Sequence, residues 1–593
     1  MHPFVFWAQV CLIPLLPFTV KAQIKQSDQT AFEALAAHYV DQWPALSPVN
    51  ATSLGDHRFD HQVDDVSAEA RQRTLLFLKE QKKALLSIHR DRLPRDLQVD
   101  FALLQHELDA RLWRLEILRE WEWNPLVYTS LTGNGVYSLL SRNFAPLPDR
   151  LRSLTRRLEA YPRVFEQVRA TLDMSRVPHV HAETAVKQNK GLRTLLDEMV
   201  FPHVSILPTD DEQKLRSAAA IALEAAEQHQ HYLENQLLPA AQGDFRIGAD
   251  LFDTKLRFAL HTPMSRQQVK ARATREFHKV RDAMYALSKR IYLKEHPYTE
   301  FPSDPSPEFK QTLTRSALEI TYRDMPGRAE IVATAESQVQ EANQFIIEKK
   351  IVTPATEPLE IILMPEFRRG VSFAYCDSPG PLDKGLKTYY AVSPIPDAWT
   401  EKQVASFLRE YNLWSMHDLT MHEAIPGHYL QLAHANQYPS TLRAMLSSGT
   451  FIEGWAVYSE RVMVNQGYLD GDDRMALINL KWYLRGITNA LMDQAIHVDG
   501  MTRDEAMRLM IEGGFQEERE AAGKWTRAQL TSAQLSTYFV GTIEHWDMRN
   551  EVEETWGSDF RLLKYHDQAL SYGSPPVQYV KALILDHPIP SGN

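Results

Sequence analysis

The chain has 593 residues, of which 44% are hydrophobic and 24% charged, the proportions of an ordinary globular protein. Its 12 Trp, 22 Tyr and 24 Phe supply enough apolar surface for a sizeable core, which excludes a disordered chain. The formal net charge of −11 argues against a nucleic-acid partner, because such proteins normally present a basic surface. Its two cysteines, Cys11 and Cys376, cannot build a disulfide framework, and Cys376 is expected to be a small, semi-buried hydrophobic residue.

The N-terminus is predicted to be a signal peptide. Residues 5–20 form an apolar run of 16 residues, whereas a membrane span needs about 20 residues. A signal peptide over residues 1–22, with cleavage near Ala22, fits this run, although the first four residues lack Lys and Arg. The sequence before Cys11 lacks the small residues of a lipoprotein site. We therefore expect a secreted or periplasmic protein with no stable membrane insertion after signal removal; an uncleaved membrane anchor is the alternative.

Most of the remaining chain is predicted to be helical. Apolar residues recur at spacings of three and four over residues 28–43, 68–88 and 96–117. An Ala-, Glu- and Gln-rich stretch over residues 212–238 indicates a long amphipathic helix. Thr502 and Glu505 form a capping box that opens a helix over residues 503–512.

Strand signals concentrate in one region of the chain. They cover residues 359–364, 372–375 and 387–392, separated by proline and glycine turns. No internal repeat or low-complexity linker interrupts the helical pattern. The sequence therefore predicts a mainly α fold, with one large helical domain over residues 23–593 and a small β insert at about residues 355–395.

Residues 417–434 carry the densest group of chemically useful side chains. His422 is followed by Glu423, and a second histidine, His428, comes six residues after the first. Zinc hydrolases place two histidines four residues apart on a helix, with a glutamate after the first, so that both imidazoles share one face. A spacing of six rotates the second histidine by about 240° on an unbroken helix. The simple zinc motif therefore does not apply directly.

The residues between the two histidines can correct this geometry. Pro426 removes one helical hydrogen bond and clashes with the carbonyl group of His422, four residues earlier. Gly427 tolerates backbone conformations that other residues avoid. We therefore predict a kink or two-residue bulge within residues 424–427 that returns His428 to the His422 face. The alternative is that the two histidines are unrelated and flank a simple helix break.

A third ligand is expected from the segment Phe451–Glu460. Glu453 lies there on an otherwise apolar helix, and Glu460 follows seven residues later on the same face. A buried carboxylate is costly unless it is paired or bound to a metal. The alternative is that Glu453 faces solvent. Glu460 and Asp418 are candidate second partners that would orient the imidazoles by hydrogen bonding to their non-ligating nitrogen atoms.

Taken in order, these motifs resemble the bacterial domain of unknown function 885 (DUF885) family, whose members are regarded as zinc metallopeptidases. The resemblance depends most on the HExxPGH pattern at residues 422–428 and the EGWAxYxE pattern at residues 453–460. It extends over roughly residues 28–585, with weaker matches at residues 51–58, 492–497, 534–541 and 559–576. One departure is that the family's Pro-Gly-Gln before a tyrosine, here Tyr538, is replaced by Ser-Ala-Gln at residues 532–534.

The resemblance implies a multi-helix, peptidase-like shell around a deep cleft, similar to the helical gluzincin peptidases. It implies that residues 411–465 form the metal-site segment of a catalytic domain. His422 and His428 would be zinc ligands, Glu453 the third ligand, and Glu423 the general base. One Zn²⁺ per chain is expected, because two imidazoles and one carboxylate favour zinc.

Such a zinc site predicts a separate role in hydrolysis for each nearby side chain. An open coordination position would hold a water molecule with a pKa of about 7, and Glu423 would take its proton. The carbonyl oxygen under attack needs a second electrophile, for which Tyr538 is the first choice and His497 the second. Tyr538 is otherwise a packed aromatic residue, and His497 could instead pair with Asp493, four residues earlier.

The leading prediction is therefore an exported zinc-dependent metallopeptidase that acts on a peptide or small amide substrate. A zinc amidohydrolase or esterase for a non-peptide substrate is the alternative enzyme, because the chemistry at the carbonyl group is the same. A metal-free binding protein on the same helical shell is the alternative from another class.

Overall fold

The computed structural model describes residues 18–364, 373–396 and 399–591, with side chains from Ser27 onward. Most of the predicted signal peptide, including Cys11, lies outside these residues. The first described element, α1 (Phe18–Leu46), includes its last five positions. In the described part of the chain, no helix combines the length and the apolar character that crossing a membrane requires.

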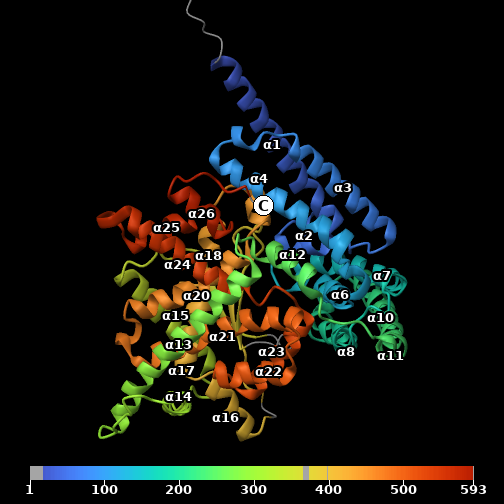
Figure 1. The fold of residues 1–593 in the computed structure, drawn as a ribbon. Coiled ribbons are helices and arrows are strands. Elements are labelled where there is room, and N and C mark those ends of the chain that lie inside the picture. Colours follow the sequence, from blue (N-terminus) through green and yellow to red (C-terminus); the bar gives the residue numbers. More distant parts are fainter. Residues whose placement is uncertain (1–17, 365–372, 397–398, 592–593) are drawn as a thin grey trace, which may run out of the picture.

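The N-terminal helices form one packed group, coloured blue in Figure 1. Helix α1 packs with α3 (Ala68–Leu86) and α4 (Arg95–Trp113), which confirms the three helices predicted from periodicity here. Their shared core contains Phe32, Tyr39 and Leu104, each at most 1% exposed. The regular spacing of apolar residues places these side chains on the inward faces of the three helices.

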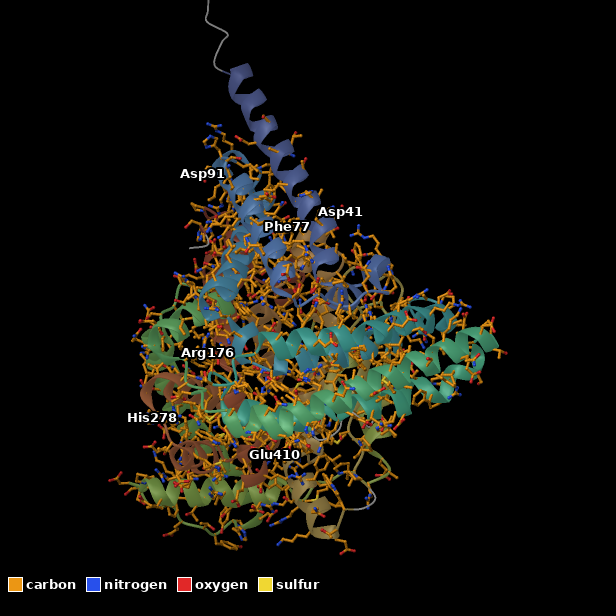
Figure 2. The ribbon with its side chains drawn as sticks, turned by 90° about the vertical axis from the view of Figure 1, so that its right-hand side faces the viewer. Asp41, Phe77, Asp91, Arg176, His278 and Glu410 are labelled. Carbon is orange, nitrogen blue, oxygen red and sulfur yellow. The ribbon has the colours of Figure 1, made fainter. Side chains whose placement is uncertain are left out.

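A second group of helices follows in the chain. Helices α7 (Leu147–Thr171) and α10 (Thr209–Tyr232) pack against each other through a core that includes five buried alanines of α10. Small side chains let the two backbones approach closely. Figure 2 shows this pair in teal, below the N-terminal helices on which Asp41 and Phe77 are labelled. Helix α10 continues into a π-helical turn, η6 (Leu233–Leu237), so the helix predicted over residues 212–238 is confirmed.

The largest hydrophobic core among the described residues lies in the C-terminal half of the chain. Helices α17, α20 and α21 contact one another, and α13 packs along α21 (Figure 1). The bounds of the helices that matter below are α13 (Arg266–Glu295), α15 (Ile331–Glu348), α17 (Leu413–Glu423), α18 (His428–Ala435), α20 (Gly449–Asn465), α21 (Asp473–Gln494), α23 (Glu518–Leu530) and α24 (Thr537–Trp556).

The predicted capping box is present at the start of α22 (Arg503–Arg508). The Glu505 amide donates to Thr502 Oγ1 at 3.4 Å, and Glu505 Oε2 accepts from the Thr502 amide at 2.8 Å. These two bonds satisfy backbone donors that the first helical turn leaves free. The remainder of the predicted helix is a π-helical turn, η10 (Leu509–Gly513).

The β insert is a three-stranded sheet of β1 (Leu359–Leu363), β2 (Ala374–Asp377) and β3 (Thr388–Val392). The strand order is β1-β3-β2, with β1 parallel and β2 antiparallel to β3, so β2 is an edge strand. The buried face of the sheet packs on α15 and α17. The fold is therefore mainly α with a small β insert, as the sequence predicts.

Candidate metal centre

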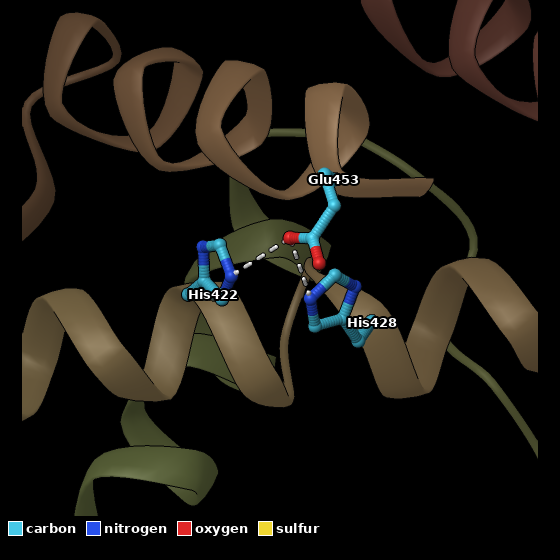
Figure 3. A group of neighbouring side chains, drawn as sticks. All are labelled: His422, His428 and Glu453. Atoms are coloured by element: carbon cyan, nitrogen blue, oxygen red, sulfur yellow. Dashed lines mark ion pairs between the residues drawn. The ribbon is translucent and has the colours of Figure 1, made fainter. Parts of the chain in front are cut away.

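Three side chains from three helices, α17, α18 and α20, converge on one point, as Figure 3 shows. His422 Nε2 lies 3.6 Å from Glu453 Oε2, and His428 Nε2 lies 3.5 Å from the same oxygen. One ligand atom from each residue lies within 4.8 Å of the other two. Donor atoms about 2.0–2.1 Å from a tetrahedral zinc ion lie about 3.4 Å apart. The observed spacing therefore suits a single cation held between the three atoms.

The surroundings of Glu453 fit a cation as well. Its Oε2 atom is buried and has no hydrogen-bond partner among the described residues. Burial raises the pKa of Glu453, but His422 and His428 outweigh that effect and hold the pKa below its usual value. An ionised, buried oxygen that accepts no hydrogen bond is costly, and a cation at this point would satisfy it.

The backbone between the two histidines is a complete break rather than the predicted kink or bulge. Helix α17 ends at Glu423, and α18 begins at His428. A Cβ atom at Gly427 would lie 1.9 Å from the carbonyl oxygen of His422, so only glycine fits there. The indole of Trp455 donates to the Pro426 carbonyl oxygen at 2.8 Å, which fixes the break to α20. The break places the imidazoles of His422 and His428 on the same side, where both can face Glu453.

A row of buried, hydrogen-bonded side chains orients the His422 imidazole through its Nδ1 atom. His422 Nδ1 lies 2.6 Å from Glu460 Oε1, and the Glu460 side chain is almost fully buried. Asn479 Nδ2 donates to Asp418 Oδ1 at 2.9 Å and to Glu460 Oε2 at 3.4 Å. Burial alone would lower the pKa of His422, but the neighbouring carboxylates of Glu453, Glu460 and Glu423 raise it well above its usual value. With its Nδ1 proton directed at Glu460, His422 presents Nε2 to the centre.

Glu423 is fixed by the edge of the β insert. Its Oε2 atom accepts a hydrogen bond from the backbone amide of Cys376, in β2, at 2.8 Å. Cys376 pairs with Tyr390 of β3 in the sheet, so the contact ties the end of α17 to the edge strand. Burial raises the pKa of the Cys376 thiol to about 12, so this thiol remains protonated, as expected of a hydrophobic rather than a reactive cysteine.

A contact between two glycines brings the helix that carries Tyr538 against the helix that carries Glu453. A Cβ atom on Gly454 of α20 would lie 2.3 Å from the carbonyl carbon of Gly541 in α24. Gly454 directly follows Glu453, and Tyr538 lies one helical turn before Gly541. Burial raises the pKa of Tyr538, and the charge of Glu453 raises it further, which places the phenol within electrostatic reach of the ligand. The protonated phenol can donate a hydrogen bond, and it lies within electrostatic range of Glu453 and His422.

His497, the second choice for the electrophile, makes different contacts. Its Nε2 atom donates to the carbonyl oxygens of Ala528 at 2.9 Å and Thr531 at 2.8 Å, at the end of α23. Its ring packs against Phe245 and Phe252. His497 lies in a π-helical turn, η9 (Ala495–Asp499), that continues α21. These contacts hold the segment that leads into α24 and do not direct the imidazole to the three ligands.

Asp493 also holds the loop between α23 and α24. Its Oδ1 atom accepts from the Ala533 amide at 3.0 Å, and its Oδ2 atom accepts from Ser536 Oγ at 3.1 Å. Ala533 has φ of 64°, a left-handed conformation in which glycine is favoured. This is the position at which the sequence departs from the family's Pro-Gly-Gln. The turn before Tyr538 therefore keeps a glycine-like backbone conformation without the glycine.

The glycine contact can be tested on stability. Gly541→Ala is expected to destabilise the fold by about 3 kcal/mol, because a methyl group there meets backbone that cannot move aside easily. Its Cβ would lie 2.1 Å from the Thr450 carbonyl oxygen. Urea unfolding measures the effect as a lower midpoint. Gly523→Ala on α23 is the matched control, since a Cβ there meets nothing within 4 Å, and its midpoint should not fall. Equal midpoints for both variants would contradict the close contact.

Sequence reasoning missed several residues that build the centre. Gly454 and Gly541 lie inside motifs that the sequence singled out, and their close approach could have been inferred from those motifs. Asn479 and the Cys376 amide carry no such signal. Neither residue type is unusual at its position, and each acts through a contact between segments far apart in the chain.

Comparisons with known proteins agree with these motifs. Residues 48–584 match the family model described as a bacterial protein of unknown function, DUF885. A solved structure from Shewanella oneidensis, described as a candidate lipoprotein of unknown function, has 32% sequence identity and a TM-score of 0.80, covering 93% of this chain and 99% of that one.

A candidate lipoprotein from Colwellia psychrerythraea shares the fold at 16% identity, with a TM-score of 0.75, covering 95% of this chain and 99% of that one. No curated protein matches the chain. The family match spans most of the sequence and includes every residue of the candidate centre. The chain therefore belongs to the DUF885 family of bacterial proteins.

Proposed function

We propose that this protein is an exported zinc-dependent hydrolase that cleaves peptide bonds. The observation that carries the proposal is the convergence of His422, His428 and Glu453 on a buried Glu453 oxygen that accepts no hydrogen bond from any described residue. Glu423 stands next to the first ligand and is fixed by the Cys376 amide. Export is supported by the apolar N-terminal run and by the lipoprotein description of the two solved relatives.

Each side chain has a role in the proposed reaction. A zinc ion held by the three ligands would polarise the substrate carbonyl group and acidify a water molecule. Glu423 accepts the proton of the attacking water and passes it to the leaving amine. Tyr538 donates a hydrogen bond to the carbonyl oxygen as negative charge develops there. Glu460 keeps His422 in the tautomer that binds through Nε2.

The experiment is hydrolysis by purified protein of a panel of short peptides and matched esters. We expect peptide cleavage that disappears when a chelator removes the metal and returns on addition of about one equivalent of zinc per chain. Loss of activity on chelation follows because neither Glu423 nor Tyr538 can activate water alone. Elemental mass spectrometry of the same samples records the metal content.

The other outcomes each select a different function. Cleavage of esters or non-peptide amides alone would replace the peptidase proposal with the alternative hydrolase. Failure to bind zinc in any sample would favour a binding protein on the same helical shell. Peptide cleavage that persists after complete metal removal would overturn the zinc mechanism.

A further inference from the structure

Three cationic side chains gather near Tyr538, and one of them, Arg527, lies 3.4 Å from its hydroxyl oxygen. Lys524 and Arg527 lie three residues apart on α23, and Arg485 lies on α21. We call these three residues the basic cluster. One acidic residue, Glu520, forms an ion pair with Arg485. No carboxylate in the described part of the chain forms an ion pair with either of the other two, so the cluster carries excess positive charge.

The basic cluster has donors that the fold leaves unused. Lys524 is 7% exposed and makes no hydrogen bond or ion pair with any residue in the described ranges. Arg485 Nη1 is buried and finds no acceptor among the same residues. Burial, together with the like charges of Arg485 and Arg527, lowers the pKa of Lys524 well below its usual value. Burial disfavours the charged form of Lys524, and an anion beside the amine would favour that form.

The basic cluster meets the proposed reaction site through Arg527 and Tyr538. Arg527 Nη2 lies 3.4 Å from the Tyr538 hydroxyl oxygen and 3.0 Å from Gln534 Oε1. Tyr538 in turn lies within electrostatic reach of Glu453, a ligand of the candidate centre, and of Arg485. One residue of extended chain spans about 3.5 Å. A peptide whose scissile carbonyl group lies beside Tyr538 would therefore bring its next one or two residues toward the basic cluster.

We propose that the basic cluster binds the free α-carboxylate of a peptide substrate, so that the enzyme removes one or two residues from the C-terminus. The proposal rests on the hydrolase function above and names its substrate class. A guanidinium group binds a carboxylate through two parallel hydrogen bonds, and an ammonium group adds a point charge. Hydrolysis adds one water across the peptide bond, giving a new carboxylate on the shortened peptide and an amine on the released residue or dipeptide.

The test measures binding separately from catalysis. Zinc-loaded Glu423→Gln protein is titrated by calorimetry with trialanine and with trialanine amide, which differ only at the C-terminal group. We expect trialanine to bind about ten- to a hundredfold more tightly, as a charge-assisted contact in a buried site provides. The preference should disappear when Lys524→Met is added, and Arg527→Gln serves as a second, independent variant.

Arg519→Gln is the matched control, because Arg519 is an exposed cation of the same helix that stacks over Trp399. It removes the same charge and should leave the preference for trialanine intact. Equal affinity for the two peptides, or no binding of either, overturns the carboxylate site. So does a preference that survives both cluster variants.

Turnover by the wild-type enzyme separates this proposal from the hydrolase function itself. Trialanine should be hydrolysed with a kcat/KM at least about tenfold above that of its amide. Equal rates would overturn the carboxylate site and leave the hydrolase standing. Absence of hydrolysis, combined with selective binding of trialanine, would overturn the hydrolase and keep the carboxylate site.

Discussion

Replacing Glu423 by glutamine is expected to lower kcat/KM for peptide hydrolysis by about 10²- to 10⁴-fold while the zinc content stays unchanged. That range is the usual contribution of a positioned general base. Glutamine keeps the shape of the side chain and an oxygen that can accept the hydrogen bond of the Cys376 amide. It cannot accept the proton of the attacking water at neutral pH. The change therefore removes the chemistry and leaves the structure in place.

Steady-state kinetics and elemental mass spectrometry on the same preparation check this expectation. Glu348→Gln is the matched control, since Glu348 is exposed at the end of α15 and should retain full activity. Wild-type activity in Glu423→Gln would mean that another group takes the proton. Loss of zinc together with activity would assign Glu423 to metal binding instead.

His428→Ala is expected to abolish stoichiometric zinc binding. The imidazole supplies one of three ligand atoms, and its Nε2 atom lies 3.5 Å from Glu453 Oε2 across the candidate centre. Loss of an outer-shell partner weakens zinc binding by about 10- to 100-fold, and loss of a direct ligand should cost more. We expect about one zinc per wild-type chain and far less than one in the variant after dialysis.

A second histidine on the same helix provides the control. His434 donates through Nε2 to the Thr353 carbonyl oxygen at 2.8 Å and belongs to α18, as His428 does. His434→Ala should retain the wild-type zinc content. Equal zinc in the two variants would show that the ion binds elsewhere, and zinc loss in both would point to collapse of the helix.

The fold was predictable to the extent that its signals are local. Helical periodicity located α3 and α10 from sequence, and the strand signals located the β insert. The break between His422 and His428 was expected at the correct residues, because Pro426 and Gly427 disturb a helix wherever they occur together. Its form was not, since the carbonyl contact of Gly427 and the Trp455 hydrogen bond depend on how α20 packs.

The candidate centre shows the same limit. The sequence indicates which side chains have useful chemistry but not where they point, so it could only rank Tyr538 ahead of His497. Contacts over long sequence separations give the two residues different surroundings. A glycine contact brings α24 to α20, while carbonyl groups at the end of α23 hold the imidazole. The basic cluster was missed because cations on amphipathic helices usually face solvent.

The hydrogen bond between Cys376 and Glu423 also bears on how the β insert avoids self-association. An edge strand presents unpaired amide groups that can recruit a strand from another molecule and begin aggregation. In β2 the outward amide of Cys376 is occupied by the Glu423 carboxylate at 2.8 Å. Loss of this acceptor would expose a template for sheet extension and would also remove the proposed general base. A Glu423→Ala chain, unlike Glu423→Gln, would then be prone to two separate defects, so its protein yield and its activity would have to be measured independently.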